Sequence, residues 1–263
     1  LLREKDLEIR MEKALADGEF LVYIQPKYWV GTRALAGGEA LVRWKSPDQG
    51  FLSPGEFIPL FEKNRFIVKL DQFMFTSVCG LLRQWLDAGI EPRPLSVNVS
   101  RMQFHTPDFV ERYIRIKSQY AIPDGLLELE FTESIFFDNV ALLSSAVHEL
   151  RRAGIKCSID DFGAGYSSLN VLKALPVSVL KLDGMFFRTA KDDEQAKIVI
   201  RNIMRMAGEL KMATVAEGVE THEQVAFLET TGCDIIQGYV FARPMPAAEF
   251  TELLAGEGGH AER

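Results

Sequence analysis

One short apolar run after another in this sequence ends in a polar or charged residue. These residues are Asn98, Glu130, the neighbours Asp160 and Asp161, Lys181, Glu217 and Gln237. Carboxylate and amide oxygens are the ligands that magnesium and manganese prefer in proteins. Two such ions that share one carboxylate are a common device for hydrolysing phosphate esters. The residue types therefore indicate a metal-dependent hydrolase of phosphate esters, provided that the fold brings them to one place.

The adjacent aspartates Asp160 and Asp161 raise a question of local geometry. Successive residues of a regular strand point to opposite faces, so both carboxylates cannot line one face. Either the chain leaves the strand here, or one carboxylate is turned into an apolar layer at considerable cost. We interpret Asp161 as lying in a turn, so that Asp160 bridges two cations while Asp161 binds only one. Gly163 and Gly165 would permit the backbone conformations of this turn, and Lys181 could orient or activate the attacking water.

Strands and helices are predicted to alternate along most of the chain. The expected strands cover residues 19–28, 37–44, 94–100, 126–131, 155–160, 177–183, 212–217 and 233–238. The expected helices cover 1–17, 53–64, 66–88, a stretch from about 107, 140–153, 166–174, 194–210, 223–230 and a last one after 246. Alternation with short connections indicates a parallel sheet covered by helices, and eight strands suggest a closed barrel. The first two strands are joined by a turn without a helix and are expected to be antiparallel. The predicted fold is therefore α/β, a (β/α)8 TIM-like barrel with an antiparallel first strand.

In such a barrel the ends of the parallel strands converge at one mouth, where the active sites of this architecture lie. Several carboxylates gathered there would repel one another unless they were protonated or neutralised by cations. The competing interpretation is that these residues cap helices, since Asp and Asn accept hydrogen bonds from free amides at helix starts. Capping explains single residues such as Asn98, but it requires neither Glu nor Lys. Glu130 and Glu217 also stand in apolar surroundings, so the whole series favours a metal site.

Composition narrows the class of protein. The formal charge is −7 with no cluster of Lys and Arg, which argues against binding to long nucleic acid. The three cysteines and four histidines are scattered, so zinc is disfavoured and the cysteines are expected to be buried thiols in a reducing compartment. No apolar run is long enough to span a membrane, and no stretch of the given sequence has the pattern expected of a signal peptide. We expect a cytoplasmic domain whose parent protein could still be anchored to a membrane, because the chain starts with Leu1 and is expected to be cut from something longer.

A series of motifs resembles the EAL domain family of cyclic di-GMP phosphodiesterases. The resemblance runs from about Leu7 to Phe250 and is carried by EALVRW, FIPLFE, VNVS, LELEFTES, DDFGAGYSSL, LKLD, AEGVET and QGYVFARPMP, in the family's order. It implies a barrel with an antiparallel first strand that hydrolyses one phosphodiester of cyclic di-GMP to linear pGpG. Magnesium or manganese would be required as a pair of ions, and calcium would inhibit. Residues 1–263 are then expected to form a single EAL domain, whose helix over 1–17 could continue a linker from an upstream domain.

The resemblance also implies a role for each matching residue. The residues expected to hold the first metal are Glu39, Asn98, Glu130 and Asp160. Those expected to serve the second are Asp160, Asp161 and Glu217, partly through water. Lys181 would contact the attacking water and Gln237 would help to position it. Residues expected to line the substrate pocket are Gln25, Leu41, Arg43, Asp183 and Glu220, with Arg43 on a phosphate. Residues expected to stabilise the loop after the adjacent aspartates are Glu133, Phe162, Gly163 and Gly165.

Two positions depart from the family's pattern. Ala164 stands where the family usually has Thr or Ser, and the missing hydroxyl could loosen the loop and lower activity. Arg65 stands where Gly is common. If the backbone there needs a positive φ, arginine causes strain; otherwise the change is a surface one.

Two other functions compete with hydrolysis of cyclic di-GMP. Some members of the family bind this dinucleotide without cleaving it and serve as receptors or scaffolds, usually after losing metal or water-positioning residues. A different barrel enzyme, which uses Lys181 as a base next to a substrate carboxylate, would also explain acidic strand ends, but it leaves EALVRW and the adjacent aspartates unexplained. The family often pairs two domains near the DDFGAGYSS loop, so a homodimer is expected, and a sensory or cyclase domain before Leu1 is consistent with the same resemblance.

Overall fold

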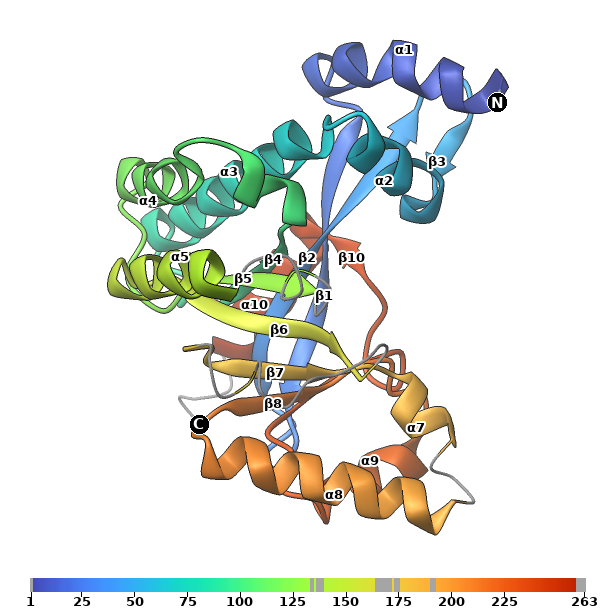
Figure 1. Cartoon of the computed structure of the whole chain (residues 1–263), viewed down its shortest axis with the longest axis vertical. Helices are drawn as coiled ribbons and strands as arrows, with labels where there is room; N and C mark the ends of the chain where they lie inside the picture. Colours follow the sequence, from blue (N-terminus) through green and yellow to red (C-terminus); the bar gives the residue numbers. More distant parts are fainter. Residues whose placement is uncertain are drawn as a thin grey trace.

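The computed structural model describes residues 2–132, 135, 140–163, 172, 176–189 and 193–258. Eight strands form a closed barrel (Figure 1), in the order β1 (Phe20–Trp29), β2 (Leu35–Ser46), β4 (Leu95–Asn98), β5 (Leu127–Thr132), β6 (Lys156–Phe162), β7 (Val179–Leu182), β8 (Ala213–Ala216) and β9 (Ile235–Gln237). β9 pairs with β1, which closes the barrel. Two further strands, β3 (Gly50–Leu52) and β10 (Met245–Pro246), pair with β2 and β1 outside the barrel. The predicted barrel is confirmed.

The first strand is antiparallel, as expected. β1 pairs antiparallel with both β2 and β9, whereas β2, β4, β5, β6, β7, β8 and β9 run parallel to their other barrel neighbours. The physical reason is the short connection from Trp29 to Leu35, which allows a hairpin but leaves no room for the crossover that a parallel pair requires.

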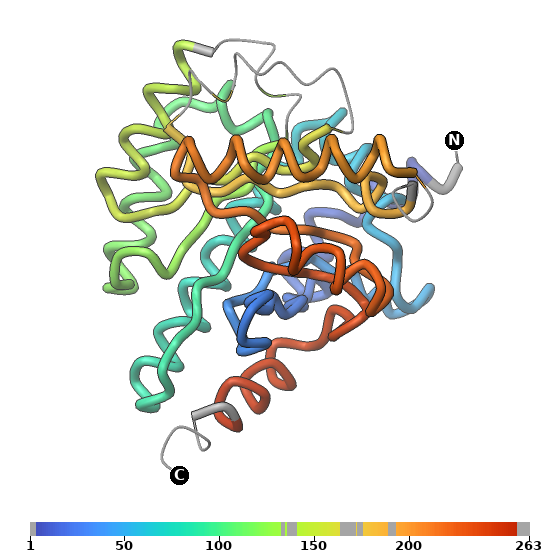
Figure 2. Tube along the Cα trace, turned by 90° about the horizontal axis from the view of Figure 1, so that it is seen from below, coloured from blue at the N-terminus to red at the C-terminus, as the bar shows by residue number. Residues whose placement is uncertain are grey.

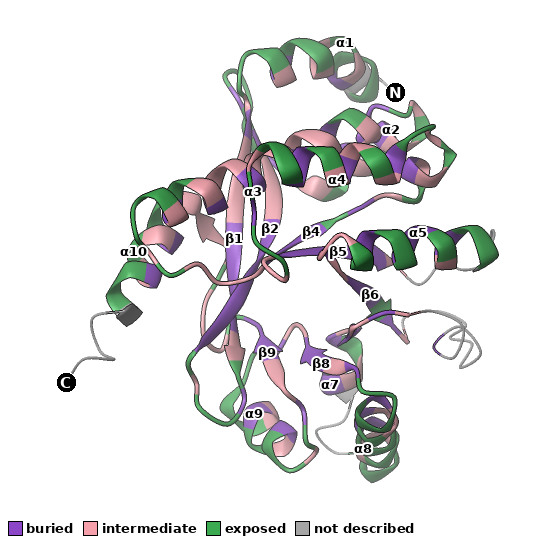
Figure 3. Ribbon diagram, turned by 90° about the vertical axis from the view of Figure 1, so that its left-hand side faces the viewer, coloured by how far each residue is buried: buried purple, intermediate pink, exposed green. Residues whose placement is uncertain are grey.

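Helices surround the strands. They are α1 (Leu2–Ala16), α2 (Pro54–Lys63), α3 (Ile67–Asp87), the 3-10 helix η1 (Arg101–His105), α4 (Phe109–Gln119), α5 (Val140–Arg152), α7 (Met185–Thr189), α8 (Glu194–Glu209), α9 (His222–Glu229) and α10 (Ala247–Gly258). Figure 3 shows that the barrel strands are largely buried while the outer faces of these helices are exposed. Of the helix predicted over 166–174, only Leu172 is among the described residues. No helix among the described residues has the length and apolar content needed to cross a bilayer.

The last helix, α10, returns to the side of the long helix α3 (Figure 2). The indole nitrogen of Trp85 on α3 donates to Thr251 Oγ1 on α10 at 2.9 Å. The ring of Trp85 also stacks on Phe250, with 5.8 Å between the ring centroids. Both aromatic side chains are fully buried, so this contact fixes α10 against the barrel next to β1.

A second, smaller core lies beyond the barrel, where β1 and β2 extend past it. It is built from aromatic residues on α2, the two strands and the α2–α3 turn, namely Phe20, Trp44, Phe57, Phe61 and Phe66. Phe61 and Phe66 meet edge to face with centroids 4.8 Å apart. Because side chains alternate along a strand, this core occupies one face of the extension. The other face, with Leu41 and Arg43, continues from Glu39 in the barrel.

The turn between α2 and α3 contains Arg65 with φ +66°. Only glycine adopts this left-handed region without steric cost, so the arginine strains the backbone. The sequence analysis expected strain at Arg65 if the backbone there needed a positive φ, and the structure shows a positive φ.

We expect Arg65→Gly to raise the free energy of unfolding by about 0.5–1 kcal/mol, after the larger entropy of glycine in the unfolded chain is subtracted. Urea denaturation measures it.

The matched control is Arg65→Ala, which removes the same side chain but keeps the strained conformation. It should leave the free energy of unfolding nearly unchanged. Equal stabilisation by alanine and glycine would show that the side chain, and not the backbone angle, is responsible.

Candidate active site

The ammonium group of Lys181 lies at the centre of a ring of carboxylates inside the barrel. Its Nζ is 2.6 Å from Glu130 Oε2, 2.7 Å from Glu217 Oε1 and 3.0 Å from Asp160 Oδ1. Glu39 Oε2 follows at 3.7 Å. Lys181 lies on β7, and the carboxylates come from β5 (Glu130), β6 (Asp160), β2 (Glu39) and the end of β8 (Glu217). Lys181 is fully buried among them. The structure thus brings together side chains that are far apart in the sequence.

An irregularity in strand β6, which the sequence analysis did not predict, brings the adjacent aspartates to the same site. The chain does not leave the strand at Asp161, because β6 continues to Phe162. Instead the register with β7 shifts between Ile159 and Phe162, and Asp161 has φ +53°. Such a bulge interrupts the alternation of side chains. The expected turn at Asp161 is therefore wrong, although alternation does break there.

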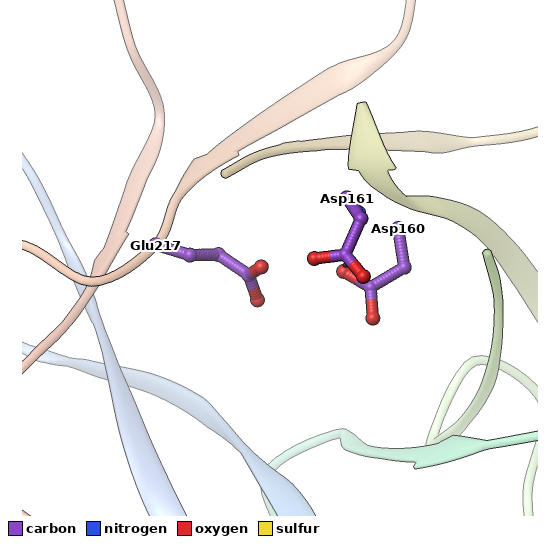
Figure 4. A group of neighbouring side chains, drawn as sticks. All are labelled: Asp160, Asp161 and Glu217. Atoms are coloured by element: carbon purple, nitrogen blue, oxygen red, sulfur yellow. Dashed lines mark hydrogen bonds between the residues drawn. The ribbon is translucent and has the colours of Figure 1, made fainter. Parts of the chain in front are cut away.

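The bulge leaves three carboxylates facing one another. Oxygens of Asp160, Asp161 and Glu217 all lie within 4.8 Å of each other (Figure 4). Asp160 is buried, Glu217 is partly buried and Asp161 is exposed, so the group opens outward from the barrel. Carboxylates at this separation suit a divalent cation, since oxygen is the preferred ligand of magnesium and manganese.

Burial and neighbouring charges shift the pKa values of the carboxyl groups in the site. Burial acts to raise the pKa of Glu130, but the ammonium groups of Lys181 and Lys27 outweigh it and hold this pKa at about 2. Burial, followed by the charges of Asp160 and Asp183, raises the pKa of Asp161 to about 6. Burial also raises the pKa of Glu217 well above its usual value. The carboxylates outnumber the two lysines, so the site favours an added cation.

Glu39 is held by side-chain amides on both of its oxygens. Asn98 Nδ2 donates to Glu39 Oε1 at 2.7 Å, and Gln237 Nε2 donates to Glu39 Oε2 at 2.5 Å. Gln237 Nε2 also lies 3.1 Å from Gln25 Oε1, and Gln25 in turn donates to the carbonyl of Ala242 at 3.3 Å. Among the described residues Gln237 Oε1 is buried without a hydrogen-bond partner. A buried acceptor in this state is suited to a water or a cation.

The end of β4, which carries Asn98, is held from outside the barrel. The backbone nitrogen of Ser100 donates to Asp71 Oδ2 on α3 at 2.9 Å, and the Ser100 hydroxyl donates to Glu62 on α2 at 3.1 Å. Burial raises the pKa of Asp71 to about 7. Gln103 Nε2 donates to the same oxygen of Asp71 at 3.3 Å. These contacts tie the strand end to α2 and α3 and so fix the position of Asn98.

Lys27 belongs to the site but was missed in the sequence analysis. Its Nζ lies 2.9 Å from Glu130 Oε1 and 2.7 Å from the hydroxyl oxygen of Ser96. The signal that could have revealed it is strand alternation: Lys27 is two residues from Gln25 and shares its face. Each carboxylate oxygen of Glu130 therefore forms an ion pair with one lysine, Oε1 with Lys27 and Oε2 with Lys181.

The residues expected to meet substrate lie around this centre. Arg43 is on the open face of the β1–β2 extension, with its guanidinium 5.5 Å from the centroid of the Tyr23 ring. Leu41 lies one pair of strand positions closer to Glu39 on the same face. Asp183 Oδ1 accepts from the backbone nitrogen of Met185 at 2.7 Å and so caps α7.

The remaining predicted residues are less central or fall outside the described ranges. Glu220 is exposed, with an oxygen 4.0 Å from Arg188. Phe162 is buried at the end of β6. Gly163 has φ +92°, and the Phe186 ring lies 2.1 Å from where its Cβ would be, so no larger residue fits. Glu133, Ala164 and Gly165 lie outside the described residues.

Comparison with known proteins gives a consistent family. A family model described as EAL domain matches residues 9–244. The cyclic di-GMP phosphodiesterase PA2567 of Pseudomonas aeruginosa is 38% identical over 238 residues, which are 90% of this chain and 40% of that protein. The bifunctional diguanylate cyclase/cyclic di-GMP phosphodiesterase MucR of the same organism is 35% identical over 245 residues, which are 93% of this chain and 36% of that protein. This chain thus spans well under half of these relatives.

A solved structure agrees in fold over nearly the whole chain. The PaMucR phosphodiesterase in complex with c-di-GMP superposes with a TM-score of 0.87 at 35% identity, covering 93% of this chain and 99% of that one.

Proposed function

This chain belongs to the EAL domain family, and from that premise we propose that it hydrolyses one phosphodiester of cyclic di-GMP to linear pGpG. The observation that carries the proposal is the cluster of Glu130, Asp160 and Glu217 around Lys181 in the barrel. The names of the relatives PA2567 and MucR, and the c-di-GMP in the PaMucR complex, support the choice of substrate.

We propose that two magnesium or manganese ions serve the reaction. The donor set fits them, since it consists of carboxylates and amides with no thiol or imidazole in the cluster. The residues proposed for one ion are Glu39, Asn98, Glu130 and Asp160, and for the other Asp160, Asp161 and Glu217. When bound, the ions would activate the attacking water and offset the charge that develops on the phosphate.

The protein's own residues supply orientation. Lys181 faces three carboxylates, which favour its charged form, so it acts as a donor that can position water or a phosphate oxygen. This also argues against an enzyme that uses Lys181 as a base. Gln237 commits its nitrogen to Glu39, so its unpartnered Oε1 can accept from the attacking water. Arg43 can bind a phosphate by charge-assisted hydrogen bonds.

The test is a product assay on the pure protein with cyclic di-GMP, analysed by mass. We expect pGpG with magnesium or manganese, and loss of at least 100-fold in rate after chelation, because the ions supply most of the charge stabilisation. Calcium should bind but support little turnover, since its looser coordination positions water poorly. Binding of cyclic di-GMP without pGpG under every metal condition would instead make the domain a receptor.

Membership of the same family also supports a proposal about the location of the domain, its oligomeric state and the protein to which it belongs. We propose a cytoplasmic domain that forms a homodimer and works in a longer protein with a sensory or cyclase domain. The named cyclase activity of MucR and the small share of that relative covered here support the longer parent. Light scattering that shows only monomer at high concentration would count against the dimer.

A further inference from the structure

The open face of the β1–β2 extension carries two aromatic rings in contact. Tyr23 on β1 lies opposite Leu41 of β2. Phe51 on β3 lies opposite Lys45 of β2. Opposite residues of antiparallel strands share a face, and alternation along β2 places Leu41, Arg43 and Lys45 on this one. The rings of Tyr23 and Phe51 meet edge to face, with their centroids 6.0 Å apart and their planes at 79°.

The guanidinium of Arg43 lies against this aromatic pair. Its central carbon is 5.5 Å from the centroid of the Tyr23 ring, within the range of a cation–π interaction. Its Nη1 also donates to the backbone carbonyl of Val42 at 2.9 Å. Both contacts are made with uncharged groups, so neither of them cancels the positive charge. The guanidinium is therefore held in place and keeps its attraction for an anion.

The ring that supports Arg43 is itself fixed by its neighbours. Tyr23 stands in the middle of three paired strands, opposite Leu41 of β2 and Pro246 of β10. Phe51 contacts it from β3, although Phe51 is 54% exposed. A long arginine side chain loses rotamer freedom when it is ordered by a ligand, and this loss weakens binding. An arginine that already rests on a fixed ring loses less freedom.

We propose that Tyr23, supported by Phe51, is a positioning residue that holds Arg43 ready for a phosphate of the substrate. The inference rests on the proposed function, in which Arg43 binds a phosphate of cyclic di-GMP. Tyr23 acts through Arg43 and requires no contact of its own with the dinucleotide. The loss of the Tyr23 ring should therefore weaken binding only when Arg43 is present.

Two other roles for the Tyr23 ring make a different prediction. An aromatic ring beside a nucleotide site can stack directly on a base. It can also simply stabilise the strands by packing. In either case the effect of removing the ring would persist after Arg43 is removed. Residues that act through one shared contact have non-additive effects, so a double-mutant cycle separates these roles.

The experiment is calorimetric titration of the full chain with cyclic di-GMP, with calcium in place of the catalytic ions. Tyr23→Leu should raise the Kd for cyclic di-GMP about fivefold, the effect of losing one cation–π contact at an exposed site. In an Arg43→Met background the same substitution should change the Kd by less than about twofold. Tyr23→Phe keeps the ring and should bind within about twofold of the wild type.

The matched control is Phe227→Leu. The ring centroid of Phe227 on α9 lies 5.4 Å from the guanidinium carbon of Arg201 on α8. The substitution therefore removes a contact of the same kind from two of the outer helices. The Kd of this variant for cyclic di-GMP should equal that of the wild type.

An equal rise in Kd with and without Arg43 would overturn the inference, because Tyr23 would then act on the substrate or on the fold directly. No rise in either background would overturn it as well, while leaving the proposed function intact. Failure of the wild type to bind cyclic di-GMP would overturn both the inference and the proposed substrate.

A second variant covers the case in which circular dichroism shows that Tyr23→Leu is unfolded. Phe51→Leu changes a half-exposed side chain and removes the ring that supports Tyr23. It should raise the Kd about twofold in the wild-type background and leave it unchanged in Arg43→Met. An unchanged Kd in both backgrounds would reject the supporting role of the aromatic pair.

Discussion

Lys181→Met is expected to lower kcat for cyclic di-GMP by about 1,000-fold, because the loss of one preorganised donor at a reacting phosphate typically has an effect of this size. The same change should lower the free energy of unfolding by about 3 kcal/mol in a chelated sample. The reason is that the ammonium contacts Glu130, Asp160 and Glu217, and without it these carboxylates are buried and uncompensated. The barrel should still fold. Steady-state kinetics with manganese and urea denaturation with chelator measure the two effects.

The control for this change is Lys69→Met. Lys69 is exposed and pairs with Glu12 on the surface, so its loss should change neither quantity by much. Manganese should restore part of the stability lost in Lys181→Met, since a ligand that binds only the folded state stabilises it. A kcat near that of the wild type in Lys181→Met would show that the role assigned to this lysine is wrong.

Glu39→Gln is expected to lower kcat by about 100- to 1,000-fold without destabilising the metal-free protein. Burial, followed by the charge of Glu130, raises the pKa of Glu39. A raised pKa in the folded state means that this carboxyl contributes stability below its ordinary pKa, and that the contribution is lost as the pH rises through the folded value. The neutral amide has no such loss, so the variant should be at least as stable as the wild type at pH 8. Gln237 can turn its free Oε1 to accept from the new amide.

The measurements are kinetics with manganese and thermal unfolding with chelator at pH 5 and pH 8. The difference in stability between variant and wild type should shift in favour of the variant from pH 5 to pH 8. Activity is thus expected to fall in both Glu39→Gln and Lys181→Met, whereas only Lys181→Met is expected to be less stable than the wild type. Destabilisation of Glu39→Gln at pH 8 would indicate that the hydrogen bonds from Asn98 and Gln237 matter more than the buried charge.

Much of the fold follows from local patterns. Strand and helix periods depend on near neighbours, so all eight barrel strands and the longer helices of the described ranges could be predicted from the sequence. The two short helices η1 and α7 were not predicted. The antiparallel start could be predicted as well, because the connection from Trp29 to Leu35 is too short for a crossover. Polar residues at successive strand ends indicated the chemistry, since parallel strands end at one mouth.

What the tertiary structure decided is which atoms meet. The bulge at Asp161 depends on the register between β6 and β7, and neither strand alone reveals it. Lys27 reaches Glu130 only because closure of the barrel sets β1 opposite β5 across the interior. Lys181 faces several carboxylates rather than one because β5, β6 and β8 surround it at matching heights. Residue type and periodicity are local properties of the chain, whereas distances of a few ångströms between distant side chains arise only when register and closure are satisfied together.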